Sequence, residues 1–137
     1  MIGILIVTHG KLGDAFIETA AFIIGSRPEF VEAVSVNVKE NTDDLRGKVA
    51  KGMKKVKQRG GVLILTDMFG GTPSNLSYSF LEEGRVEVIS GINLPILIKA
   101  VDSRKDMKLA DLTECLEVYG KRSISTASGI LKGNKRV

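Results

Sequence analysis

The chain has 137 residues, of which 43% are hydrophobic, and it carries a formal net charge of +4. This length suits a single domain with a full apolar core, and its apolar runs are far shorter than the roughly 20 residues that span a bilayer. With no tryptophan and two tyrosines, the composition also disfavours nucleic-acid binding, which needs stacking aromatic side chains on a basic face.

Domain organisation and compartment follow from the same composition. We expect one domain over residues 1–130 and a basic tail over residues 131–137. The single cysteine, Cys115, excludes an intrachain disulfide and fits the reducing cytoplasm, and its spacing from Leu112 and Leu116 predicts a core position on a helix. The first residues lack the positive charge of a secretory signal peptide, so none is expected.

Apolar runs typical of strands alternate with segments of helical spacing along the whole chain. A continuous run such as Ile2–Thr8 predicts a strand that is buried on both faces. The predicted elements are, in chain order, a strand at Ile2–Thr8, a helix at Leu12–Ile24, a strand at Phe30–Val38, a helix from Asn41 or Thr42 that ends before Gly60, a strand at Val62–Leu65, a helix that starts at Thr72, a strand at Val86–Ser90, helices at Leu94–Val101 and Met107–Tyr119, and an edge strand at Ser123–Ser128.

Repeated alternation of strand and helix predicts an α/β fold with a doubly wound, mostly parallel sheet. For a chain this short we expect the flavodoxin-like strand order 2-1-3-4, with Ser123–Ser128 antiparallel at one edge or donated to a neighbouring subunit. Right-handed crossovers then place the first and third strands side by side. The loops that follow these two strands form the crevice where open α/β sheets bind ligands.

His9, the only histidine of the chain, lies in the first of these loops, and Asp67 lies in the loop after the third strand. An imidazole has a pKa near 6.5, so one of its nitrogens can be a free nucleophile at neutral pH. A carboxylate on the other nitrogen would fix the tautomer, as the third group does in a catalytic triad. Each residue alone favours a structural role in its loop, but together, with the anion-binding helix start that follows Asp67, they favour a catalytic pair. One histidine and one cysteine do not predict a metal site.

The segment after Asp67 predicts a site for an anion. Gly70 and Gly71 permit a close backbone approach, and Thr72 is a good N-cap with Pro73 in the first position of the helix. Free N–H groups at such a helix start, with the Thr72 hydroxyl, suit a phosphate-sized anion. The segment is neither a Walker loop nor a dinucleotide fingerprint, so a nucleotide cofactor is not expected.

Three segments of the chain resemble the IIA component of the mannose/fructose/sorbose family of the bacterial phosphoenolpyruvate-dependent sugar phosphotransferase system. They are Thr8-His9-Gly10 after the first strand, Thr66–Asn75 after the third, and Gly91–Pro95 after the fourth. The Asp-x-x-Gly-Gly-Thr-Pro-x-Asn string is the most specific of them. The region after about Arg104 carries little of the resemblance.

The resemblance implies a phosphotransferase that needs no cofactor and works through a phosphohistidine at His9, with Asp67 bonded to the imidazole. The backbone of Gly70, Gly71 and Thr72 would hold the phosphoryl oxygens. Family members accept the phosphoryl group from the carrier HPr and pass it to a histidine of a IIB component. That component phosphorylates the sugar during uptake through membrane IIC and IID partners. Members of the IIA family are usually homodimers that exchange a C-terminal strand.

The partner surface around His9 should be an exposed apolar rim that includes Met68 and Phe69. Asn93 borders the same crevice and is a weaker member of this partner surface, because it also suits a role in shaping the fourth loop. Lys11 and Arg104 are expected to be surface charges.

Two other functions remain open from the sequence. One is the phosphocarrier subunit of dihydroxyacetone kinase, which shares the histidine position. The other is a regulatory protein whose phosphorylation at His9 gates binding to another protein. The Thr72–Asn75 continuation and the Gly91–Pro95 loop favour the sugar-transport branch.

Overall fold

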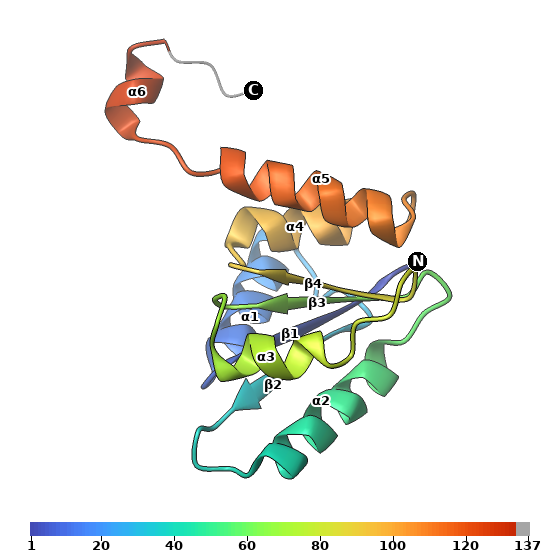
Figure 1. Cartoon of the computed structure of the whole chain (residues 1–137). Coiled ribbons are helices and arrows are strands. Elements are labelled where there is room, and N and C mark those ends of the chain that lie inside the picture. Colours follow the sequence, from blue (N-terminus) through green and yellow to red (C-terminus); the bar gives the residue numbers. More distant parts are fainter. Residues whose placement is uncertain (134–137) are drawn as a thin grey trace.

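Four parallel strands form the centre of the computed structural model, which describes residues 1–133 (Figure 1). The order across the sheet is β2-β1-β3-β4, with every neighbouring pair parallel, so the predicted flavodoxin-like order is confirmed. The strands are β1 (Gly3–His9), β2 (Val31–Val36), β3 (Val62–Thr66) and β4 (Val86–Ser90).

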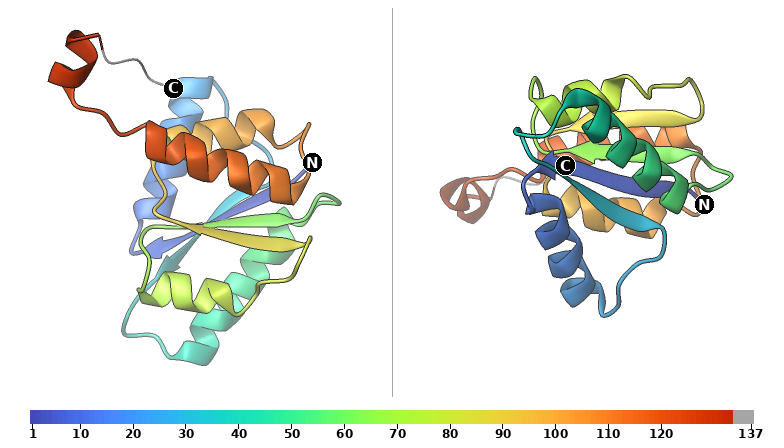
Figure 2. Two further views of the ribbon diagram at one scale, coloured as in Figure 1. Left: turned by 45° about the horizontal axis from the view of Figure 1, so that its top comes forward. Right: turned by 90° about the horizontal axis from the view of Figure 1, so that it is seen from below.

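Helices cover both faces of this sheet, as a doubly wound fold requires (Figures 1 and 2). α1, α4 and α5 pack on one face, and α2 and α3 pack on the other. Their bounds, with those of the C-terminal α6, are α1 (Leu12–Ile24), α2 (Thr42–Val56), α3 (Thr72–Tyr78), α4 (Leu94–Ser103), α5 (Leu109–Arg122) and α6 (Ala127–Leu131). In the part of the chain described, no helix combines the length and apolar character needed to cross a membrane.

The hydrophobic core consists of two layers divided by the sheet. Ile4 and Ile6 of β1 belong to the layer under α1, α4 and α5, whereas Leu5 and Val7 belong to the layer under α2 and α3. Because alternate side chains of a strand point to opposite faces, a strand with helices on both sides must be apolar throughout. The continuous run at Ile2–Thr8 therefore follows from the central place of β1.

Local hydrogen bonds explain where several helices begin and end. Gly25 adopts a left-handed conformation (φ 99°) and its N–H bonds back into α1, which ends the helix as predicted. The Asn41 side chain accepts a hydrogen bond from the N–H of Asp44 at 2.8 Å and so caps α2. The start of α3 differs by one residue from the prediction: Gly71 is the N-cap, and Thr72 is the first helical residue.

The predicted edge strand at Ser123–Ser128 is wrong. After α5 the chain forms the short helix α6, which stands apart from the sheet and its covering helices (Figures 1 and 2). The Thr126 hydroxyl accepts a hydrogen bond from the N–H of Gly129 at 3.2 Å and caps this helix. Isoleucine and threonine favour strands, but serine and threonine hydroxyls also bond to nearby backbone, and here that local bond prevails. The sheet therefore ends at β4.

The helices and strands do not decide where the domain ends and the basic tail begins. α6 spans the predicted junction between a domain ending at residue 130 and a basic tail from residue 131. Residues 134–137 of that tail lie outside the described residues. The division remains a prediction.

Arg104 is buried rather than on the surface, which corrects the sequence-based expectation. Its side chain is 3% exposed and donates to the backbone carbonyls of Glu29 (2.6 Å), Ile2 (3.4 Å) and Phe30 (3.5 Å). Burial lowers the pKa of the guanidinium, and the charge of Glu29 opposes this shift. The guanidinium thus serves as a donor to carbonyls from two segments.

The sequence also predicted the burial of Cys115 and the exposure of Lys11. Cys115 is half-buried, so the expected core position is wrong, although its neighbours Leu112 and Leu116 are in the core. Lys11 is exposed, as predicted.

Candidate active site

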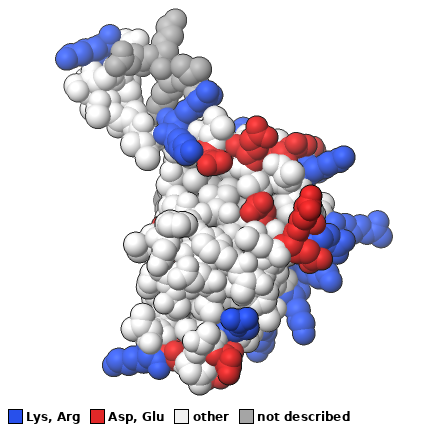
Figure 3. Space-filling view, viewed as in Figure 1, with Lys and Arg blue, Asp and Glu red and all other residues white. Residues whose placement is uncertain are grey.

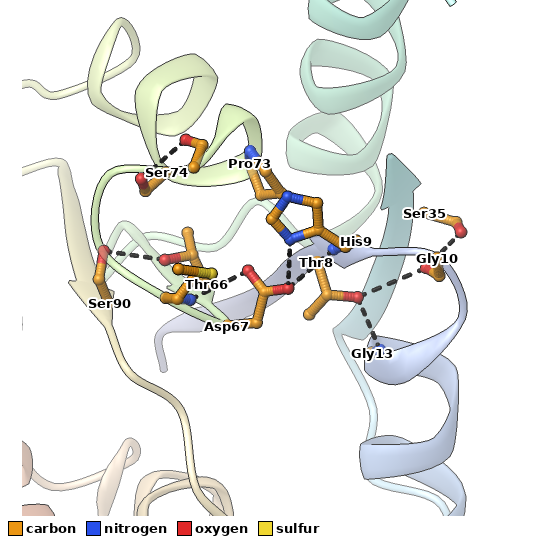
Figure 4. A network of polar contacts seen from close by, with 12 residues as sticks. Thr8, His9, Gly10, Gly13, Ser35, Thr66, Asp67, Pro73, Ser74 and Ser90 are labelled. Atoms are coloured by element: carbon orange, nitrogen blue, oxygen red, sulfur yellow. Dashed lines mark hydrogen bonds and ion pairs between the residues drawn. The ribbon is translucent and has the colours of Figure 1, made fainter. Parts of the chain in front are cut away.

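His9 and Asp67 come together where the neighbouring strands β1 and β3 end (Figure 4). His9 is the last residue of β1, and Asp67 directly follows Thr66, the last residue of β3. In this pair of strands Val7 lies opposite Thr66, so the two loops leave the sheet side by side. The predicted meeting of the two side chains, 58 positions apart in the chain, is confirmed.

The Asp67 carboxylate binds His9 twice. Its Oδ2 lies 2.7 Å from Nδ1 of the imidazole and accepts the backbone N–H of His9 at 2.9 Å, and its Oδ1 accepts the N–H of Met68 at 3.0 Å. Burial raises the pKa of Asp67, but these hydrogen bonds and the charge of His9 outweigh it, so the net pKa lies below the ordinary 3.8. Asp67 is therefore ionised at neutral pH.

The ionised carboxylate determines the tautomer of His9. A carboxylate can only accept hydrogen bonds, so Nδ1 carries the hydrogen in the contact at 2.7 Å. Nε2 of the neutral ring then keeps its lone pair. The His9 side chain is 40% exposed, whereas that of Asp67 is 11% exposed, so the nucleophile is accessible and its orienting group is largely covered.

Gly71 lies close to the edge of the imidazole formed by Cε1 and Nε2. A Cβ atom at this position would be 2.8 Å from Cε1 and 3.3 Å from Nε2 of His9. Any side chain at Gly71 would therefore displace either the ring or the loop. The imidazole thus binds the Asp67 carboxylate at Nδ1 and leaves no room for a side chain at position 71.

Ser74 holds the loop between β3 and α3 in place. Its side chain is buried, accepts the N–H of Gly70 at 3.1 Å and donates to the carbonyl of Gly71 at 3.0 Å. The Gly70 N–H is thus already used, whereas in residues 1–133 the N–H groups of Gly71 and Thr72 have no hydrogen-bond partner. Sequence reasoning treated Ser74 only as a helix residue, although a buried serine just after a Gly-Gly turn is a typical loop anchor.

Hydroxyl groups fix the loop after β1 in a similar way. Thr8 is buried, and its Oγ1 accepts the N–H of Gly13 at 2.9 Å and donates to the carbonyl of Gly10 at 3.5 Å. The Ser35 hydroxyl donates to the same carbonyl (Figure 4). These bonds tie the backbone after His9 to α1 and β2. They were not anticipated from the sequence.

A second hydroxyl chain joins the ends of β3 and β4 to α3. Thr66 donates to the hydroxyl of Ser90 at 2.8 Å, and the Tyr78 hydroxyl lies 2.9 Å from the same atom. The ring of Tyr78 in turn lies 6.3 Å from that of Phe69, between centroids. This chain supports the Asp67 loop from the side away from His9.

The two apolar residues predicted for the rim are exposed. Met68 is 55% and Phe69 is 78% exposed, directly after Asp67. Asn93 instead uses its amide within the fold: its Oδ1 accepts the N–H of Ile96 at 2.9 Å, which caps α4, and its Nδ2 donates to the carbonyl of Gly120 at 3.3 Å. Its place on a partner surface remains a prediction.

Fold and site together define a class of protein: a flavodoxin-like α/β domain that presents one oriented histidine at the switch point of its sheet. Comparison with known families specifies the class. Residues 3–117 match the family described as the fructose IIA component of the phosphotransferase system. The chain belongs to this family of IIA components, which are phosphocarriers of sugar phosphotransferase systems.

Individual relatives agree with this assignment. The fructose-specific EIIA component of Bacillus subtilis (strain 168) is 33% identical over 129 residues, which is 93% of this chain and 88% of that protein. The mannose-specific EIIAB component of Escherichia coli (strain K12) is 33% identical over 106 residues, or 77% of this chain and 32% of that protein. A crystal structure of an EIIA component from Streptococcus agalactiae superimposes with a TM-score of 0.82 at 29% identity, covering 93% of this chain and 98% of that one.

Proposed function

We propose that Nε2 of His9 accepts a phosphoryl group from an HPr-like carrier and passes it to a histidine of a IIB component. The contact of 2.7 Å between Nδ1 and the ionised Asp67 carries this proposal, because it leaves Nε2 as the nitrogen with a free lone pair. The family membership supports the direction of transfer.

The transfer is an in-line displacement at phosphorus. The lone pair of Nε2 forms the new N–P bond while the N–P bond of the donor phosphohistidine breaks, and its electron pair returns to the donor imidazole. The His9 ring gains positive charge as the bond forms, and the Asp67 carboxylate, 2.7 Å from Nδ1, stabilises that charge. The same steps in reverse deliver the group to IIB.

Backbone amides next to Nε2 provide the phosphoryl site in this proposal. The N–H groups of Gly71 and Thr72, with the Thr72 hydroxyl, would bind the phosphoryl oxygens as the ring is phosphorylated. Gly71 adjoins Nε2, which supports this placement. Gly70 contributes its left-handed turn (φ 86°) rather than a donor, because its N–H is bonded to Ser74.

Partner proteins would dock on the apolar rim formed by Met68 and Phe69, with Asn93 at its border. Both partners present a histidine, so both need direct access to Nε2, and the exposed rim next to it is suited to a transient apolar contact. We place the protein in the cytoplasm, with membrane IIC and IID components reached only through IIB.

We also propose that the protein is a homodimer. β4 is the edge of the sheet, and a groove of about 430 Å³ runs between it and α5. Ile124 and Leu131 of the C-terminal segment are 80% and 86% exposed, so a single chain does not cover them. Light scattering should give twice the chain mass of 14.8 kDa, and a mass of one chain would contradict the dimer.

Phosphorylation with purified components tests the central claim. Incubation with phosphoenolpyruvate, Enzyme I and HPr should add one acid-labile phosphate per chain, and His9→Gln should add none while its circular dichroism spectrum is unchanged. Transfer to a IIB domain should then release the label. Stable labelling of the His9→Gln protein would rule out His9 as the acceptor.

A further inference from the structure

Basic side chains gather at the edge of the sheet opposite His9. Arg85 immediately precedes β4, Arg59 lies three residues before the start of β3, and Lys57 follows the last residue of α2. Because all four strands are parallel, their amino ends share one edge, about 20 Å from their carboxyl ends. Figure 3 shows Lys and Arg side chains gathered at that edge, on the right, with acidic side chains beside them.

The three basic residues line one hollow, which we call the basic hollow. It has a volume of about 430 Å³, and its lining residues are Lys57, Gln58, Arg59 and Arg85. The lining contains three cations, one amide and no carboxylate. Its volume falls in the range of small-ligand sites, roughly 300–1,000 Å³. An adjoining hollow of about 170 Å³ shares Lys57, Gln58 and Arg85 and also includes the acidic Glu82.

The basic side chains of the hollow form no ion pairs in the described part of the chain. Among residues 1–133, Lys57, Arg59 and Arg85 take part in no ion pair, whereas Arg27 and Lys48 each pair with a glutamate. Three unpaired cations around one depression repel each other, and an anion between them would relieve that repulsion.

Backbone contacts hold the basic hollow in a fixed shape. The N–H of Gly60 bonds to the carbonyl of Met1 at 3.0 Å, and that of Val62 bonds to the carbonyl of Arg85 at 2.8 Å. A Cβ atom at Gly60 would lie 2.6 Å from the Met1 carbonyl oxygen, and one at Gly61 would lie 2.5 Å from that of Arg85. These close approaches fix the turn that carries Arg59 against the start of β4, so the backbone positions of both arginines are set in advance.

The dipole of α2 accounts for only some of the basic residues at this edge of the sheet. Lysines in its last turn interact favourably with the negative end of the helix dipole. Arg59 and Arg85 belong to turns at the starts of two strands and gain nothing from that dipole. Their planar guanidinium groups match the geometry of phosphate oxygens, to which they can each donate two hydrogen bonds.

We propose that the basic hollow binds the phosphate groups of a polyphosphorylated anion, separately from the chemistry at His9. Such a ligand brings two or more negative charges to the three cations that line the hollow. Free polyphosphorylated molecules and clustered phosphate headgroups of an anionic membrane share this chemistry. The experiment has one arm for each source.

The first arm measures calorimetric binding of pyrophosphate, and the second measures sedimentation with vesicles of phosphatidylglycerol against vesicles of phosphatidylcholine. Each arm compares the native chain with Arg59→Gln/Arg85→Gln and with Lys51→Gln/Lys55→Gln. Both double variants remove two exposed charges, but Lys51 and Lys55 line neither hollow. We expect the arginine variant to bind at least about tenfold more weakly and the lysine variant to bind as the native chain does.

The outcomes distinguish a soluble ligand from a lipid headgroup, and a failure of this proposal from a failure of the phosphocarrier function. Selective loss of pyrophosphate binding identifies a soluble ligand, and selective loss of phosphatidylglycerol binding alone identifies the lipid headgroup. Equal losses in the two double variants, or no binding in either arm, would overturn the proposal. His9→Gln should bind normally in both arms, so a failure here is distinct from a failure of the phosphocarrier function. Melting temperatures verify that the two double variants, which are changed at exposed positions, and His9→Gln, which is changed at a half-buried one, remain folded.

Discussion

The two carboxylate oxygens of Asp67 bind His9 at the end of β1 and the backbone that follows β3. One oxygen binds both the imidazole and the backbone N–H of His9, and the other binds the N–H of Met68. The carboxylate therefore orients the nucleophile and also connects the ends of β1 and β3. A residue that serves catalysis in this way should also contribute to folding stability, and its contribution should depend on pH.

Asp67→Asn tests this dependence. The pKa of Asp67 is lowered in the folded state, so the ionised carboxylate stabilises the fold fully above the unfolded pKa of about 3.9. That stabilisation is lost as the pH falls through the lower folded-state pKa. We expect the native chain to exceed Asp67→Asn in free energy of unfolding at pH 7, with a difference that shrinks below about pH 4. Urea unfolding between pH 2.5 and pH 7 measures it, using about 0.5-unit steps. A difference that is constant over this range would show that the charge of Asp67 does not matter.

At the scale of an element, the loop from β3 to α3 likewise contributes several parts of the site. It supplies the carboxylate, the rim and the backbone next to Nε2, and the buried hydroxyl of Ser74 binds its Gly-Gly turn. α3 has seven residues, so its start depends on these local bonds more than on helix propensity. The position of Gly71 is the most sensitive point of the loop.

Gly71→Ala should reduce phosphoryl transfer about a hundredfold, because a Cβ atom 2.8 Å from Cε1 of His9 must move the ring or the loop by a fraction of an ångström or more. The backbone at Gly71 is extended (φ −91°), so alanine brings no backbone strain. The rate of phosphate transfer from HPr, measured by rapid quench, gives the effect.

Gly47→Ala is the matched control. Gly47 is an exposed residue inside α2, and a Cβ atom there meets no other atom within 4 Å. This substitution should leave transfer unchanged and raise the free energy of unfolding by about 0.5–1 kcal/mol. If both variants transferred phosphate at the native rate, the packing of Gly71 on the imidazole would have no functional role.

The elements themselves were largely predictable from the sequence. β1 and β3 are apolar throughout because both their faces are covered, and this pattern gave their positions to within one residue. The meeting of His9 and Asp67 followed from the strand order and the right-handed crossovers. The segment from Ser123 to Ser128 was mispredicted, because a capping bond from Thr126 competes with strand formation and depends on geometry that composition does not encode. The role of Ser74 was missed for the same reason.

At the scale of the whole molecule, Arg104 joins distant parts of the chain. It follows α4, and its guanidinium binds carbonyls of the first strand region and of the turn before β2. Phe30 in that turn is the one non-glycine residue with positive φ (55°) in residues 1–133, and its carbonyl also accepts the N–H of Ile4. Sequence patterns indicated an exposed charge at Arg104, because its acceptors are backbone groups 74 to 102 positions away.

Arg104→Met should lower the free energy of unfolding by about 2 kcal/mol or more, because it removes three hydrogen bonds of a buried guanidinium to the carbonyls of Ile2, Glu29 and Phe30. Arg27→Met serves as the comparison, since Arg27 forms an exposed ion pair with Glu32 whose loss should cost less than about 1 kcal/mol. Urea denaturation of the two variants measures both effects. Equal losses would mean that the buried guanidinium is no more important than a surface ion pair.

The clamped imidazole also governs the order of events in a relay. Under the proposed function, the ring that Asp67 binds at Nδ1 and that Gly71 packs near Cε1 presents Nε2 as its one reactive nitrogen. Donor and acceptor must then occupy the same volume above Nε2, one after the other. We therefore expect ping-pong kinetics without a ternary complex, with an excess of either partner inhibiting turnover by excluding the other.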